Sequence, residues 1–224
     1  PQTGVTSNPA LLVAKDARTK PQKRRALTVQ ELQQVQSVLI NHTRDPELGL
    51  LVLRTFLETG ARRGELLART VADVQRPAQK IRLQGMKKTG IRYQPVTDKL
   101  LTALQEFAAN RHGFTGEIPP WEGQRAQFLN HRKEPITRRY LESTAEKIRR
   151  HAPQLGASGE VYFTWHLLRH TAGTLVERSG GFAVSQKFLG HKGALNNSAA
   201  AVTLRYTEAS DEEVKKAVHA IWGA

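Results

Sequence analysis

The 224-residue sequence contains no cysteine, so it cannot form a disulfide bond, a thiolate metal site or a cysteine nucleophile. It also lacks an apolar run that approaches the ~20 residues of a membrane-spanning helix, and no signal peptide opens it. We therefore expect a cytoplasmic protein that makes no contact with a membrane.

Negative charge is scarce in this chain. Its 34 lysine and arginine residues outnumber 20 aspartate and glutamate residues, which leaves a formal net charge of +14. Such an excess repels itself unless a polyanion neutralises it, although many charged side chains only face solvent. The composition therefore favours a nucleic acid as the partner.

The first 27 residues contain three prolines and six basic residues but no sustained apolar period. This composition is typical of an extended segment, so we expect residues 1–27 to form a basic interdomain linker. We further expect the chain to be the C-terminal part of a longer protein.

Most of the remaining sequence has helical periodicity. The capping box TVQE at Thr28 predicts the start of a first helix, which should end before residue 41. Alternation in KIRLQ (80–84) and IRYQPV (91–96) predicts a β-hairpin, with irregular loops over 113–132 and 152–160. The sequence thus predicts a mainly α fold with a small antiparallel β-sheet. The further helices are expected over 46–58, 61–70, 98–110, 135–150, 166–179, 183–190 and 211–222.

The stretch WHLLRHTAGT (165–174) places His166, Arg169 and His170 on one helical face. Paired histidines with this spacing hold zinc in some peptidases, but the general-base position is Leu167 here, and Arg169 would repel a metal. Either histidine alone could be a hydrogen-bonded core residue. Together with the arginine they are better suited to phosphate.

Other candidate phosphate ligands are scattered along the chain. They are Arg62 in ETGARRGEL, a lysine in the hairpin segment KKTG, His191 in FLGHKG and Tyr206 in LRYTEAS. Each has a structural alternative: Arg62 could be a structural residue paired with Glu65, the lysine could face solvent, and the tyrosine could serve only packing. His191 follows a glycine that ends a helix and is not distinctive by itself.

Taken together, these segments resemble, in their order and their residues, the catalytic domain of the tyrosine recombinases, the family of phage integrases and Xer-type enzymes. The resemblance runs from about Thr28 to Tyr206 and implies a tyrosine recombinase catalytic-domain fold over 28–210. Residues 211–224 would form a C-terminal helix that packs either in cis or on a neighbouring protomer. The matching sequence motifs are TGARRGEL (59–66), KKTG (87–90), HLLRHTAGT (166–174), LGH (189–191) and RYT (205–207).

The resemblance also implies a role for each candidate residue. The hairpin lysine is either Lys88 or Lys87. The motif KTG favours Lys88, whereas counting residues back from Pro95 along the second strand favours Lys87. Side chains alternate along a strand, so only one of the two can face DNA. Tyr206 would be the nucleophile that forms a 3′-phosphotyrosyl link, Arg62 and Arg169 would bind the nonbridging oxygens, and the lysine would be the acid for the leaving 5′-oxygen. His166 would be the general acid/base, and His191 would donate a hydrogen bond to the phosphate. The remaining residues would support the site or bind DNA: Glu65 as a partner of the arginines, His170 as a structural residue, and Arg63, Lys87 and Arg92 as DNA contacts.

By the same resemblance, the reaction is site-specific recombination of double-stranded DNA through a Holliday junction. It is carried out by a tetramer on DNA in a bacterial or phage-infected cell, without a metal, ATP or another cofactor. Three alternatives stay open. A type IB topoisomerase has a similar site, a DNA-binding domain could have lost catalysis, and a metal-dependent nuclease is disfavoured because no cluster of acidic ligands is present.

Overall fold

The computed structural model describes residues 25–84, 90–115, 122–191 and 209–223. None of the helices in these ranges is long and apolar enough to cross a membrane. The helices are α1 (Val29–His42), α2 (Pro46–Thr59), α3 (Arg63–Leu67), α4 (Asp98–His112), α5 (Arg138–His151), α6 (Trp165–Gly180), α7 (Phe182–Leu189) and α9 (Asp211–Trp222). The strands are β1 (Val74–Gln75), β2 (Lys80–Gln84) and β3 (Ile91–Pro95).

This architecture confirms the predicted mainly helical fold with a small antiparallel sheet. Helix α1 ends two residues later than expected, at His42, and α5 begins at Arg138 rather than at residue 135. The delay in α5 has a local cause: Pro135 pairs with Leu129 in a β-bridge, which holds the chain extended ahead of the helix. Strand β1 was not predicted, because two residues are too short for an alternation to be recognised.

The predicted capping box fixes the start of α1. The Thr28 hydroxyl accepts a hydrogen bond from the Glu31 backbone N–H at 3.2 Å, and the Glu31 carboxylate accepts one from the Thr28 N–H at 2.7 Å. Just before the box, the Leu27 N–H donates to the Thr171 hydroxyl on α6 at 3.0 Å. The beginning of the described chain is therefore tied to helix α6.

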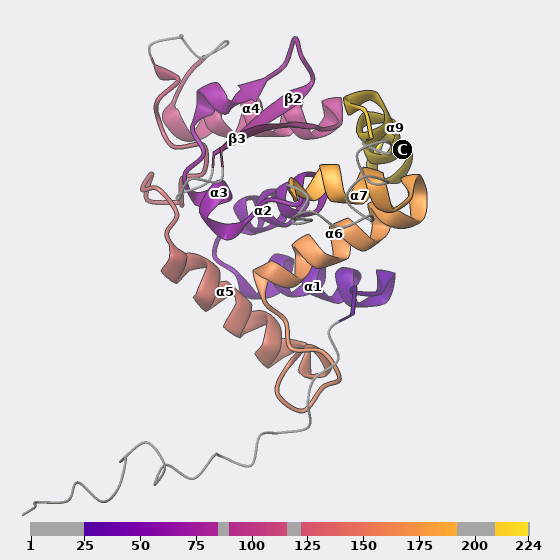
Figure 1. Ribbon diagram of the computed structural model, residues 1–224. Helices are drawn as coiled ribbons and strands as arrows, with labels where there is room; N and C mark the ends of the chain where they lie inside the picture. Colours follow the sequence, from indigo (N-terminus) through magenta and orange to yellow (C-terminus); the bar gives the residue numbers. More distant parts are fainter. Residues whose placement is uncertain (1–24, 85–89, 116–121, 192–208, 224) are drawn as a thin grey trace, which may run out of the picture.

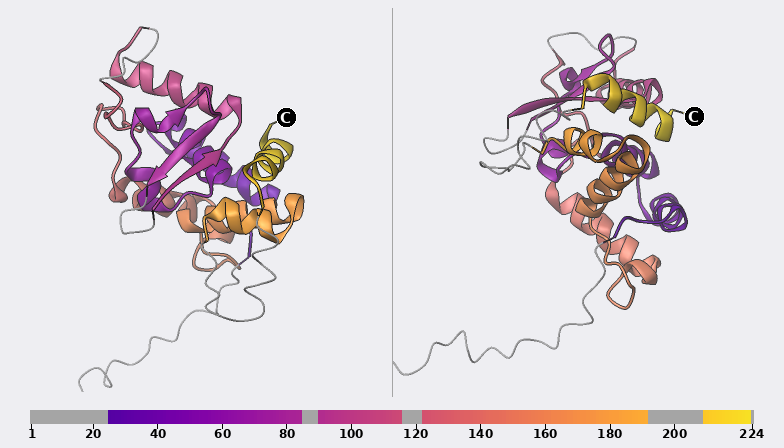
Figure 2. Two further views of the ribbon diagram at one scale, coloured as in Figure 1. Left: turned by 45° about the horizontal axis from the view of Figure 1, so that its top comes forward. Right: turned by 45° about the vertical axis from the view of Figure 1, so that its right-hand side comes forward.

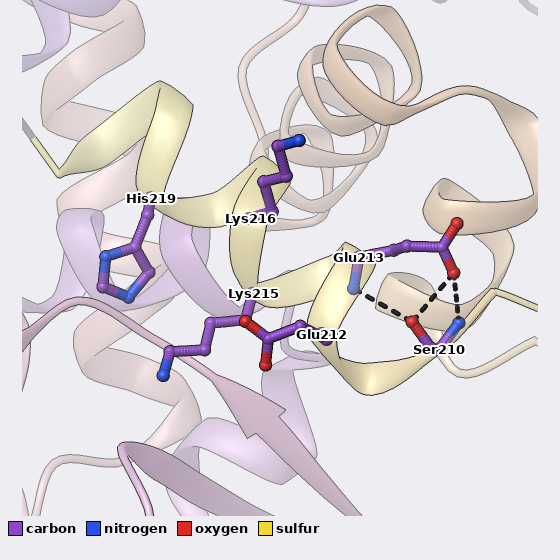
Figure 3. Close-up of a pocket in the computed structure, with 6 residues that line it drawn as sticks. All are labelled: Ser210, Glu212, Glu213, Lys215, Lys216 and His219. Carbon is purple, nitrogen blue, oxygen red and sulfur yellow. Dashed lines mark hydrogen bonds between the residues drawn. The ribbon is translucent and has the colours of Figure 1, made fainter.

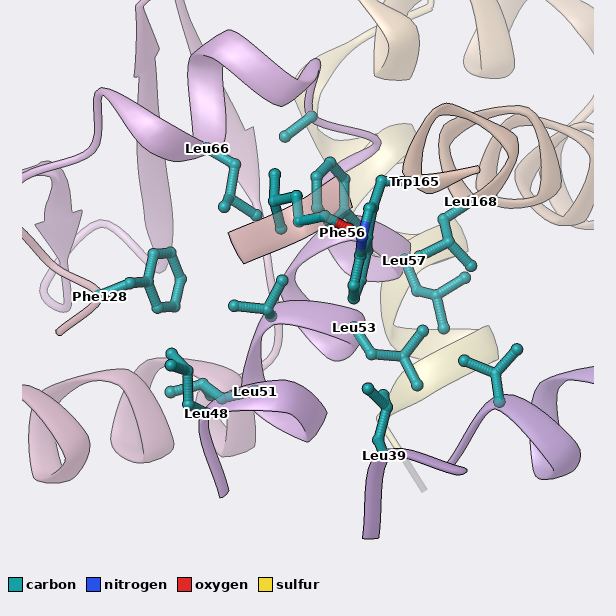
Figure 4. Packing of buried hydrophobic residues seen from close by; sticks show 14 of the residues in the cluster. Leu39, Leu48, Leu51, Leu53, Phe56, Leu57, Leu66, Phe128, Trp165 and Leu168 are labelled. Carbon is teal, nitrogen blue, oxygen red and sulfur yellow. Dashed lines mark hydrogen bonds between the residues drawn. The ribbon is translucent and has the colours of Figure 1, made fainter. Parts of the chain in front are cut away.

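Helix α2 occupies the middle of the molecule, where it packs against α1, α4 and α6 (Figure 1). Its apolar side chains surround the helix axis, and Phe56 stacks on Trp165 of α6 with ring centroids 5.3 Å apart (Figure 4). The helix ends at Gly60, which adopts a left-handed conformation with φ 54°. Because most of α2 is buried, the residues that follow Gly60 start from a well-packed position.

The sheet has the strand order β1-β2-β3, and both pairs are antiparallel. In the register of β2 and β3, Leu83 lies opposite Arg92 and Ile81 lies opposite Gln94. Leu83 and Ile81 are fully buried, and cross-strand partners share a face of the sheet. Arg92 is therefore on the inner face, whereas its neighbour Tyr93 is on the exposed face.

Helix α9 packs against α6, α7 and β3 of the same chain (Figure 2). Val214, Ala217 and Val218 contribute its buried face to a second apolar cluster, which also contains Phe188. At its first residue, the Asp211 carboxylate bonds to Lys80 of β2 and to Lys187 of α7, both at 2.9 Å. Packing of this helix on a neighbouring protomer stays a prediction.

Candidate active site

Arg169 is the most enclosed of the predicted catalytic residues that the structure describes. It lies in the second turn of α6, it is 4% exposed, and its guanidinium donates to the backbone carbonyls of Gly60 and Leu189. These two carbonyls end α2 and α7. Burial, with repulsion from Arg92 and Arg62, lowers the pKa of Arg169 to about 10, so the side chain is still charged at neutral pH.

Arg62 lies at the N-cap of α3 and is held by Glu65 one turn later. The Arg62 backbone N–H and its Nη1 each donate to the Glu65 carboxylate at 2.8 Å. Burial raises the pKa of Glu65, but the charge of Arg92 and the hydrogen bonds from Arg62 outweigh it, so the net shift is downward. The Arg62 side chain is 38% exposed and can still reach an anion from solvent.

His166 and His191 are both exposed near these arginines. His166 precedes Arg169 by one turn of α6, and His191 follows Gly190, which ends α7 with φ 63°. The Nδ1 atom of His191 lies 3.2 Å from the side-chain oxygen of Gln186. Partial burial and the positive charge of Arg169 lower the pKa of both histidines below the ordinary value of 6.5. Both are therefore mainly neutral at pH 7.

Arg62 contributes to the lowered pKa of both histidines. We expect the variant Arg62→Gln to raise the pKa of His166 and of His191, since a nearby positive charge disfavours the imidazolium form. An NMR titration of the imidazole signals measures both values. Arg63→Gln is the matched control, and an equal rise in that variant would contradict a local effect of Arg62.

The structure also describes three further residues that were predicted to belong to the site, Arg92, Arg63 and His170. Arg92 points inward: its side chain is 17% exposed and its Nη atoms bond within the protein, because the strand register places it on the inner face, which does not favour the DNA contact expected for it. Arg63 is 45% exposed and lies 3.8 Å from Glu142. His170 is exposed, which does not support the structural role expected for it. Lys87, Lys88 and Tyr206 lie outside the described residues.

The sequence reasoning missed the groups that hold the arginines. The carbonyl acceptors at Gly60 and Leu189 carry no side-chain signal, although a glycine that ends each helix was visible. The role of Arg92 could have been suspected from its strand, since it shares a face with Gln94 and the buried Leu83.

A shallow pocket lies elsewhere, on helix α9 (Figure 3). Its volume is about 390 Å³, and it contains none of the predicted catalytic residues. Among the residues that the structure describes, no three His, Asp or Glu side chains gather into a group that could hold a metal ion. The residues lining the pocket are Ser210, Glu212, Glu213, Lys215, Lys216 and His219.

Solved structures share this fold. The XerA recombinase superposes with a TM-score of 0.56 at 22% identity, covering 88% of this chain and 65% of its own. Lambda integrase bound to DNA gives a TM-score of 0.54 at 21% identity, covering 80% of this chain and 61% of its own. The Tn1549 transposon integrase in complex with transposon right end DNA gives a TM-score of 0.56 at 19% identity, covering 92% and 68%.

Sequence relatives point to the same family. The tyrosine recombinase XerC of Pelobacter propionicus is 27% identical over 92% of this chain and 62% of its own length. XerC of Herpetosiphon aurantiacus is 31% identical over 74% of this chain and 49% of its own length. The chain thus spans about half to two thirds of the length of these relatives. The model of the Phage integrase family matches residues 25–213, so the chain belongs to this family of tyrosine recombinases.

Proposed function

We propose that this chain is the catalytic domain of a site-specific DNA recombinase that acts through a 3′-phosphotyrosyl intermediate. One observation carries the proposal. Arg62 and Arg169 are fixed by Glu65 and by backbone carbonyls, while His166 and His191 lie beside them. Membership of the family supplies the reaction class, and its DNA-bound members favour double-stranded DNA as the substrate.

The two arginines would bind the nonbridging oxygens of the scissile phosphate. Negative charge gathers on these oxygens in the transition state, and donors that are already in place stabilise it without rearrangement. Arg169 is placed by two carbonyls and Arg62 by a carboxylate, so neither has to be ordered by the DNA. His191 would add a further hydrogen bond to the phosphate.

Tyr206 would be the nucleophile. Its phenolic oxygen forms a bond to phosphorus while the bond from phosphorus to the 5′-oxygen breaks. A mainly neutral His166 can accept the phenolic proton, because its lowered pKa leaves the imidazole unprotonated at pH 7. Lys88 (or Lys87) would give a proton to the leaving 5′-oxygen.

The phosphotyrosyl ester keeps the energy of the broken bond, so a 5′-hydroxyl from another duplex can attack it and reseal the strand. Strand exchange would then need neither ATP nor a metal. Two rounds of this exchange pass through a Holliday junction, and four protomers on two DNA sites would carry them out.

Covalent capture tests the proposal. We expect the protein, incubated in EDTA with nicked duplexes that cover the DNA flanking its own gene, to form an adduct that resists SDS. Tyr206→Phe should abolish this adduct and spare DNA binding, because only the phenolic oxygen is removed. The matched control is Tyr93→Phe, which removes the hydroxyl of an exposed tyrosine on β3. An adduct that persists in Tyr206→Phe would contradict the nucleophile assignment.

The same experiment separates the alternatives. A type IB topoisomerase would relax supercoiled DNA without a defined site, whereas a recombinase should give adducts at one sequence. A DNA-binding domain without catalysis would bind the duplex and form no adduct. A metal-dependent nuclease would lose its activity in EDTA.

A further inference from the structure

Arg92 of β3 makes an unusual number of contacts for a single side chain. Its Nη1 donates to the Gln94 side chain at 2.7 Å and to the Phe188 carbonyl at 2.8 Å. Its Nη2 donates to Glu65 at 3.1 Å and lies 3.3 and 3.4 Å from the carbonyls of residues 59 and 60. One guanidinium therefore joins β3 to the ends of α2 and α7 and to helix α3.

Arg92 also shares an acceptor with each of the two predicted catalytic arginines. The Gly60 carbonyl accepts from Arg92 and from Arg169. The Glu65 carboxylate accepts from Arg92 and from Arg62. A shift of Arg92 would therefore move the acceptors that place both arginines.

The turn that leads to His191 closes directly over Arg92. A Cβ atom added to Gly190 would lie 2.7 Å from Cδ of Arg92, which leaves no room for a side chain at that position. Burial lowers the pKa of Arg92, but the carboxylate of Glu65 acts against this shift. The side chain is thus mostly enclosed on the inner face of the sheet, and both of its Nη atoms are paired.

We infer that Arg92 is a positioning residue: it clamps helix α3 and the ends of α2 and α7 to β3, and the groups at these points place Arg62, Arg169 and His191. This inference rests on the proposed function for the reaction that it affects. The clamp needs an arginine, because a guanidinium offers five donors in a fixed plane, whereas a lysine offers three from a single atom.

Two substitutions separate the geometry of Arg92 from its charge. Arg92→Lys keeps the positive charge and loses the planar fork, and Arg92→Gln loses both. For Arg92→Lys we expect the single-turnover cleavage rate at saturating DNA to fall by about 100-fold, the typical cost of a small misplacement in an active site. DNA affinity should stay close to that of the unchanged protein, because Arg92 is mostly buried and its Nη atoms bond within the protein.

The pKa of His191 provides a second readout, since Arg92 is one of the cations that lower it, together with Arg169 and Arg62. The value should rise in Arg92→Gln and change little in Arg92→Lys, measured by NMR. The control is Arg82→Lys on the neighbouring strand, where Arg82 faces outward and bonds to Asp73 and Gln84. This control should leave cleavage unchanged.

The outcomes are distinct. Cleavage by Arg92→Lys at the unchanged rate would overturn the inference, and so would a loss confined to DNA affinity. If the unchanged protein forms no adduct, the proposed function fails, and the backbone NMR signals of Gly60, Glu65 and Leu189 still test the clamp, because they should shift in Arg92→Lys and stay in place in Arg82→Lys. If Arg92→Lys does not fold, Glu65→Asp takes its place, because a shorter carboxylate is withdrawn from both arginines. Cleavage at the unchanged rate by that variant would likewise overturn the inference.

Discussion

Replacing Arg169 with lysine is expected to slow DNA cleavage by about 100- to 1000-fold, the usual effect of losing one placed donor to a transition-state oxygen. DNA affinity should fall far less, because affinity is spread over many phosphate contacts. The physical reason is geometric. The Arg169 guanidinium is fixed by two backbone carbonyls, and an ammonium group cannot bind both of them and a phosphate oxygen in one plane.

Single-turnover cleavage of a nicked duplex measures the rate, and a binding titration of the same duplex measures the affinity. Arg178→Lys is the matched control, since Arg178 is exposed in the last turn of the same helix. Equal losses of rate and affinity in Arg169→Lys would show that Arg169 only attracts DNA.

Replacing Gly60 with alanine is expected to lower the free energy of unfolding by about 2–5 kcal/mol. Two costs add up. The backbone has φ 54°, which is strained for any L side chain, and the new Cβ would lie 2.6 Å from the ring of the fully buried Phe188. Any relief of this clash would also move the carbonyl that holds Arg169.

Gly113→Ala separates these two costs. Gly113 ends α4 with φ 80°, and an added Cβ there meets no atom within 4 Å. This control should lose only the backbone cost of about 1–2 kcal/mol. Denaturant unfolding of both variants measures the difference, and equal losses would contradict a clash with Phe188.

Local signals explain how much of the fold could be predicted. The capping box at Thr28, the proline at the start of α2 and the glycines after α2 and α7 act within one turn of the chain, and the structure has a helix boundary at each. The start of α5 was missed because a contact between Leu129 and Pro135 decides it, and no local pattern reports such a contact.

In the site, too, local features could be predicted from the sequence and long-range contacts could not. The sequence spacing alone placed His166 and Arg169 on one helix, and the structure brings this helix to Arg62. The inward direction of Arg92 was not predicted, because it depends on the register of β2 and β3. A basic residue near a hairpin tip is expected to face solvent, and only its pairing with Leu83 shows that it points inward.

The carbonyls that hold Arg92 and Arg169 belong to the C-terminal ends of two helices. Thr59 and Gly60 end α2, and Phe188 and Leu189 end α7. The end of a helix carries about half of a negative elementary charge, spread over its free carbonyl groups. Two helix dipoles thus stabilise a cluster of three guanidinium groups, of which two bond to a single carboxylate and the third bonds to backbone carbonyls. A separate carboxylate for each arginine would have neutralised the cluster, whereas the partial charges of the carbonyls help to anchor it and leave a net positive potential available to a phosphodiester.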